Sequence, residues 1–183
     1  MVWDNYILEQ FQTAVPGGEH DESRYYGPYC TLLHQLFPAP EHFMLVPQYK
    51  RPEQSKAVDF TTIFIVRHKC HPCFFLEIKA LGHLEKPSDR QAADDQMRER
   101  YGKLFDEVEI SALYGMSAIG TRVCLYEWDR ETRKIEPPAI PKDCNYTMDT
   151  APIDRWNLDI LSVEGEKCLR AVVARVKTMC SQI

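Results

Sequence analysis

Three residues near the middle of the chain are of the types that bind cations and anions. Asp59 comes before a run of Phe, Thr, Ile and Val, while Glu77 and Lys79, separated by Ile78, end a second hydrophobic run. β-Branched and aromatic residues are typical of half-buried strands. Charges on such strands are usually paired or hold a metal, because desolvating them alone costs several kcal/mol. The pattern therefore indicates either a metal site or a structural ion pair between Asp59 and Lys79, with Glu77 solvated.

The two hydrophobic runs predict one β-hairpin whose turn centres on Lys69. In that register Asp59 lies opposite Lys79, and Thr61 lies opposite Glu77. Because partners in an antiparallel pair share a face and side chains repeat with period two, Asp59, Glu77 and Lys79 are expected to project from one side. A slip of one residue would turn Asp59 to the other side, so the prediction depends on the turn.

Hydrophobic periodicity predicts the elements around this hairpin. One helix ends at a Pro-Gly-Gly break, and a second is expected to start near Pro28, since proline is tolerated in a first turn. A helix after the hairpin is expected to begin with a capping box of Ser88 and Gln91. The expected order is a helix at 3–15, a helix from 28 to 36, strands at 43–46, 58–66 and 74–80, a helix reaching 108, strands at 113–119 and 122–128, and a helix after 162. This order predicts an α/β fold, a mixed sheet flanked by helices, in a single domain of residues 1–183.

Composition limits the classes of function. The chain of 183 residues has 44% hydrophobic and 27% charged residues and a formal net charge of -5, so no global basic field attracts nucleic acid. A polyanion would have to be held by a local patch, a metal or both. The start of the chain lacks the pattern of a secretory signal, no apolar run approaches a membrane span, and the seven cysteines are scattered. These features predict an intracellular protein of the cytoplasm or nucleus that is not secreted and has no membrane partner.

The placement of Asp59 and the Glu77-Ile78-Lys79 triplet on a hairpin followed by an amphipathic helix resembles the PD-(D/E)XK nuclease superfamily, which has a restriction-endonuclease-like fold. The chain also resembles uncharacterised fungal proteins of this type. The likeness covers residues 22–128, with an αβββαβ core, and leaves 129–183 as a C-terminal extension. One departure is Val58, which stands where the family has proline before the aspartate.

The resemblance implies a metal-dependent nuclease that hydrolyses DNA or RNA. Asp59, Glu77 and the main-chain carbonyl of Ile78 would bind Mg²⁺ or Mn²⁺, and Lys79 would orient water or stabilise the phosphate. The same likeness implies a further acid from a preceding helix, for which Glu22 is the candidate. Related double-strand cutters often act as dimers, so a homodimer is an open expectation. The alternatives are a nuclease-like binding or regulatory module without catalysis and an unrelated α/β domain in which the triplet is coincidental.

The helix after the hairpin offers further candidates. Gln96, Arg100 and Lys103 fall alongside its buried stripe at helical spacing. The resemblance places a glutamine of this helix near the metal, and the two cations would bind backbone phosphates. The competing interpretation is an ordinary solvated face on which Asp94 and Arg98 form a surface pair.

Weaker candidates come from acids and histidines elsewhere. Glu9, on the first helix, is a second possibility for the additional acid, and for both Glu9 and Glu22 the alternative is a solvated surface acid. His34 is expected to be a core or boundary residue in preference to a metal ligand. The Cys70-x-x-Cys73 pair stands alone and lacks the second cluster of a structural zinc site, so turn chemistry is the preferred interpretation.

Overall fold

The computed structural model describes residues 3–50, 61–141 and 148–183. Asp59 lies outside these ranges. The predicted alternation of helices and strands is confirmed. The helices are α1 (Asn5–Ala14), α2 (Ser23–Leu36), α3 (Pro87–Leu104) and α4 (Val163–Cys180), and the strands are β1 (Phe43–Lys50), β2 (Thr61–His68), β3 (His71–Lys79), β4 (Ala112–Ile119), β5 (Arg122–Asp129), β6 (Ile135–Glu136) and β7 (Leu158–Asp159). Single 3₁₀ turns lie at Val15–Gly17, Ala39–Glu41, Leu81–His83, Phe105–Glu107 and Ile153–Trp156.

The strands form one mixed seven-stranded sheet in the order β1-β2-β3-β4-β5-β6, with β7 also paired to β5. β3 and β4 are parallel and are joined through α3, whereas the other pairs are antiparallel. Parallel neighbours require such a crossover, which an α-helix usually supplies. β3, which carries Glu77 and Lys79, is therefore an interior strand between β2 and β4.

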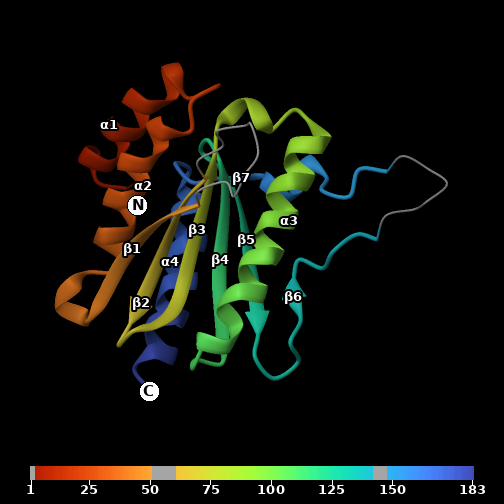
Figure 1. The fold of residues 1–183 in the computed structure, drawn as a ribbon. Coiled ribbons are helices and arrows are strands. Elements are labelled where there is room, and N and C mark those ends of the chain that lie inside the picture. Colours follow the sequence, from red (N-terminus) through yellow and green to blue (C-terminus); the bar gives the residue numbers. More distant parts are fainter. Residues whose placement is uncertain (1–2, 51–60, 142–147) are drawn as a thin grey trace.

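Helices cover both faces of the sheet, as Figure 1 shows. α3 packs on the face of Phe75, whose ring lies 4.8 Å from that of Tyr101. A Cβ at Gly115 would come within 2.8 Å of Phe75 and Met97 atoms, so glycine is what allows α3 to approach β4 this closely. The opposite face holds Phe64 and Phe74, which α2 and the residue after it cover, and α4 lies behind the sheet in this view (Figure 1).

α2 begins earlier than its sequence predicts. The expected start near Pro28 is wrong, because the helix begins at Ser23 and contains Pro28 in its interior. Tyr25 and Tyr29 lie one turn apart and are fully buried, so packing of this first part offsets the backbone hydrogen bond that Pro28 cannot make. Asp21 accepts a hydrogen bond from the backbone N–H of Ser23 at 3.0 Å and fixes the start of the helix.

The predicted capping box of α3 is also wrong. The helix begins at Pro87 with Lys86 at its N-cap, and no side chain caps it. Proline suits the first helical position since its missing N–H would lack a partner there anyway. Ser88 instead donates to Asp89 at 3.1 Å. The predicted buried stripe is confirmed on α3 by Ala93, Met97, Tyr101 and Leu104, but the helix ends at Leu104 and does not reach 108 as predicted.

The β2–β3 hairpin exists, but its register differs from the predicted one by two residues. Lys69 and Cys70 form a two-residue turn in which both have positive φ, the conformation that hairpin turns of type I′ require. The register of the β2–β3 pairing also shifts between Val66 and Arg67, as at a β-bulge. The partner of Glu77 is consequently Ile63 and not Thr61. Because the shift is an even number of residues, each residue of β3 keeps the face predicted for it.

Candidate functional site

Glu77 is a buried acid near the carboxyl end of an interior strand. Its residue is 3% exposed, and it pairs with Ile63 of β2 on one side and Ser117 of β4 on the other. It shares a face of β3 with Phe75, so its side chain lies on the side covered by α3. A carboxylate in this position needs compensation by a cation or by hydrogen bonds.

Arg100 of α3 supplies one such cation. Its Nε donates to Glu77 Oε1 at 3.4 Å, and its side chain is 12% exposed. Gln96 lies one turn earlier on α3, and its Oε1 is buried without a hydrogen-bond partner among the residues that the structure describes. Lys103 differs, because it forms an exposed pair with Glu99 at 2.5 Å. The three predicted side chains of α3 therefore divide into two that lie inward and one that lies at the surface.

Lys79 and Ile78 end the same strand. Lys79 is half-buried and shares the face of Glu77, and within residues 3–50, 61–141 and 148–183 its side chain has no hydrogen-bond or ion-pair partner. Its main-chain carbonyl accepts a hydrogen bond from the N–H of Gly120 at 2.9 Å. The side chain of Ile78 is fully buried. Because this side chain has no oxygen or nitrogen, Ile78 could hold a cation only through its main-chain carbonyl.

Glu22 lies at the N-cap of α2. It accepts a hydrogen bond from the Tyr26 hydroxyl at 2.7 Å, and the Tyr26 ring packs 6.4 Å from that of Phe64. Phe64 pairs with Leu76, the neighbour of Glu77, so its side chain lies on the opposite face of the sheet. The Tyr26 hydroxyl therefore joins the Glu22 carboxylate to a side chain that packs on this face.

The donors near the end of β3 fit a hard divalent cation in their chemistry. Glu77 has carboxylate oxygens and Ile78 a main-chain carbonyl, and Mg²⁺ prefers oxygen ligands with only one or two protein carboxylates. In the described part of the chain, no three His, Cys, Asp or Glu side chains form a group that could hold a metal ion. The second predicted carboxylate, Asp59, lies outside that part.

A second buried acid on α3 was missed by the sequence interpretation. Asp94 is 5% exposed and accepts hydrogen bonds from Arg98 Nε at 2.8 Å and Nη2 at 3.0 Å. Arg155 Nη1 donates to it at 2.6 Å and the Tyr126 hydroxyl at 2.8 Å. The prediction that Asp94 and Arg98 form a solvated surface pair is wrong, because Arg155 and the segment before it cover this part of the helix.

Arginines extend this cluster along α3. Arg90 donates to the carbonyls of Ala151 at 2.8 Å and Leu84 at 2.7 Å and also contacts the Asp149 carboxylate. Arg98 donates to the carbonyl of Pro137 at 2.9 Å. These bonds attach Pro137, Asp149 and Ala151 to α3. Arg90, Asp94 and Arg98 follow one another at four-residue spacing along the helix, which was the signal in the sequence, but the Pro137, Asp149 and Ala151 partners are distant in the chain.

The Asp94 cluster is largely buried. Burial raises the pKa of the Tyr126 phenol well above its ordinary value, and the neighbouring Cys124 thiol and Asp94 add to the shift. Burial also raises the pKa of the Cys124 thiol to about 11. Both side chains lie on the face of β5 toward α3. Buried surroundings of this kind, with their lower dielectric constant, make each hydrogen bond to Asp94 stronger.

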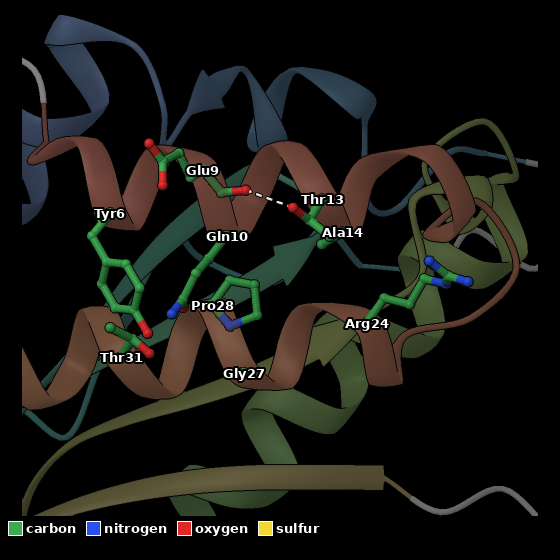
Figure 2. Close-up of a pocket in the computed structure, with 9 residues that line it drawn as sticks. All are labelled: Tyr6, Glu9, Gln10, Thr13, Ala14, Arg24, Gly27, Pro28 and Thr31. Atoms are coloured by element: carbon green, nitrogen blue, oxygen red, sulfur yellow. Dashed lines mark hydrogen bonds between the residues drawn. The ribbon is translucent and has the colours of Figure 1, made fainter.

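A hollow of about 500 Å³ lies elsewhere, between α1 and α2. Figure 2 shows Tyr6 and Gln10 of α1 directed toward α2, whereas Glu9 points away from it. Glu9 is exposed, as is His34 near the end of α2, which was expected in the core or at its boundary. All the residues that line this hollow belong to α1 and α2, and Glu77 is not among them.

Comparison with known proteins adds no relationship: no family model matches the chain, and no curated protein or solved structure matches it. Within the described ranges, no helix has both the length and the apolar character needed to cross a membrane.

Proposed function

We propose that the chain is a metal-dependent nuclease of the restriction-endonuclease-like type, which hydrolyses phosphodiester bonds of nucleic acid. The observation that carries the proposal is the buried Glu77 on interior strand β3, two residues before Lys79 and in contact with Arg100. The order of three antiparallel strands, a crossover helix and a parallel fourth strand supports it, since this is the arrangement expected of such a core.

In this proposal each residue has a defined role. Glu77, Asp59 and the Ile78 carbonyl would hold Mg²⁺ or Mn²⁺, which lowers the pKa of bound water and offsets charge on the attacked phosphate. Lys79 would donate to the attacking water or to a phosphate oxygen, since its ammonium group has donors without a partner in the described ranges. Gln96 has a buried acceptor near Arg100 on the same helix, suited to hold a water or substrate hydroxyl.

Isosteric variants test the proposal. Asp59→Asn, Glu77→Gln and Lys79→Met should each reduce Mn²⁺-dependent cleavage of plasmid DNA, single-stranded DNA or RNA by about a hundredfold or more, the scale seen when one stabilising group is removed. Asp95→Asn, at an exposed position of α3, is the matched control and should cleave like the parent. Circular dichroism melting verifies that each variant is folded.

Two results would contradict the nuclease. If all three variants cleaved as fast as the parent, the residues would have been assigned to the wrong site. If the parent bound nucleic acid but hydrolysed none of the substrates with Mg²⁺ or Mn²⁺, the chain would be a binding or regulatory module and not an enzyme. Added metal should also raise the melting temperature of the parent, since a ligand of the native state stabilises it.

A further inference from the structure

Arg100 differs from the other arginines on this side of the sheet in how it uses its nitrogens. Arg90 donates from all three guanidinium nitrogens, and Arg98 and Arg155 each donate from two. Arg100 uses Nε alone, toward Glu77, and its Nη1 and Nη2 have no hydrogen-bond partner among the described residues. A guanidinium with two adjacent donors available has the geometry to bind a phosphate through both.

The position of Arg100 also makes it a competitor of any cation at Glu77. Its Nε lies 3.4 Å from the Glu77 oxygen, and the carboxylate side chain is only 4% exposed. Like charges close together in a poorly hydrated place repel more strongly than in water. A divalent cation that binds Glu77 therefore meets the positive charge of Arg100 directly.

We propose that Arg100 is a positioning residue that couples cation binding to phosphate binding, pairing with Glu77 before the cation arrives and with a substrate phosphate afterwards. The inference rests on the proposed nuclease function. Arg100 opposes the cation while its charge is uncompensated. A phosphate on Nη1 and Nη2 compensates that charge, so cation and nucleic acid tighten each other's binding. Such coupling is reciprocal, because each ligand changes the other's affinity by the same factor.

Binding measurements test this coupling without relying on cleavage. Mn²⁺ affinity of the full chain is measured by calorimetry, and nucleic-acid affinity by anisotropy of short fluorescein-labelled phosphorothioate DNA and RNA strands, with and without Mn²⁺. Arg100→Gln should bind Mn²⁺ about tenfold more tightly than the parent, which corresponds to about 1.4 kcal/mol. The same variant should bind the strands about tenfold more weakly. The mutual tightening seen in the parent should disappear.

Two control variants separate charge from geometry. Lys103→Gln removes the same charge three residues away on α3, but from an exposed pair, and should change Mn²⁺ affinity less than about twofold. Arg100→Lys keeps the charge and loses the forked donors. It should bind Mn²⁺ like the parent and the strands more weakly.

The outcomes distinguish the inference from the function on which it rests. If Glu77→Gln abolishes Mn²⁺ binding but Arg100→Gln leaves the affinity unchanged, Glu77 holds the metal and the coupling role of Arg100 is wrong. If Arg100→Gln weakens both ligands, Arg100 merely supports the local structure and the proposal is again overturned. If the parent has no Mn²⁺ site that Glu77→Gln removes, the proposed nuclease and the coupling both fall.

Discussion

Two buried acids, Asp94 and Glu77, lie on the α3 side of the sheet. They differ in the number and length of the hydrogen bonds that arginine side chains donate to them. Asp94 accepts four hydrogen bonds between 2.6 and 3.0 Å from Arg98, Arg155 and Tyr126. The Arg100 contact to Glu77 comes from one nitrogen at 3.4 Å. Ideal, multiple bonds to a buried carboxylate are typical of a group that holds elements together.

The comparison shows why burial of an acid does not by itself indicate a binding site. The donors to Asp94 come from α3, from β5 and from the 3₁₀ turn at Ile153–Trp156, so they join three parts of the chain. Arg98 Nη2 also donates to the Pro137 carbonyl, and Arg155 Nη2 donates to the Pro138 carbonyl. Arg100 Nη1 and Nη2 have no hydrogen-bond partner among the described residues. A site is therefore better recognised by unused donors around the acid than by the acid alone.

The largest expected effect is on stability at Asp94. Asp94→Asn should lower the free energy of unfolding by about 3–5 kcal/mol, because Arg98 and Arg155 would keep buried charges without their carboxylate. Urea denaturation measures it. Asp95→Asn is the control, since Asp95 is exposed on the same helix and should change stability by less than about 0.5 kcal/mol. A loss at position 94 as small as that at 95 would mean that the cluster does not stabilise the fold.

Glu77→Gln should cost less than Asp94→Asn in the same denaturation experiment, about 1–2 kcal/mol. Arg100 loses one long contact, and its other nitrogens are not engaged with described residues. The ratio of the two losses sharpens the comparison. Equal losses would show that Glu77 is as much a structural group as Asp94, and the distinction between the two acids would fail.

The sequence predicts local structure well where a periodic apolar pattern determines it. The stripe of α3 and the N-cap of α4 are examples: Ser162 accepts a hydrogen bond from the Gly165 N–H at 2.9 Å, as a helix after Ser162 requires. The prediction that β2 and β3 form a hairpin is also correct. Its register is not, because Lys69 and Cys70 adopt positive φ without being Gly or Asn, the residues that signal such a turn.

The candidate site shows a different limit of prediction. Helical spacing correctly places Arg100 alongside the buried stripe, close enough to meet Glu77. Spacing alone does not distinguish it from Lys103, which lies at the surface. Asp94 and Arg98 look like a solvated pair since no neighbouring residue reveals Arg155, whose position in the sequence is 61 residues from Asp94. Contacts between residues this far apart in the sequence depend on how the whole chain packs.

A conservative change at the edge of the Asp94 cluster should have a smaller effect. Tyr126→Phe removes the hydroxyl that donates to Asp94 at 2.8 Å and should cost about 1–1.5 kcal/mol, the typical contribution of one such bond. Tyr101→Phe is the matched control. The Tyr101 hydroxyl is buried without a partner in the described part of the chain, so its removal should be neutral or stabilising. A cost at 101 that matched the cost at 126 would argue against a specific Tyr126–Asp94 bond.

The smallest effect concerns pH. Burial raises the pKa of Cys124 in the folded protein to about 11, from an ordinary value near 9. As the pH rises through 9, the unfolded chain releases this proton first, so stability falls between about pH 9 and 11. Cys124→Ala has no thiol at this position and so does not lose this stability. Its free energy of unfolding relative to the parent should rise by about 1 kcal/mol between pH 9 and 10. Because water admitted to the cluster would lower the thiol pKa, introducing Asp94→Asn into both proteins should shrink that difference. An unchanged difference would mean that Cys124 is kept dry by the sheet alone and that the Asp94 cluster does not seal it.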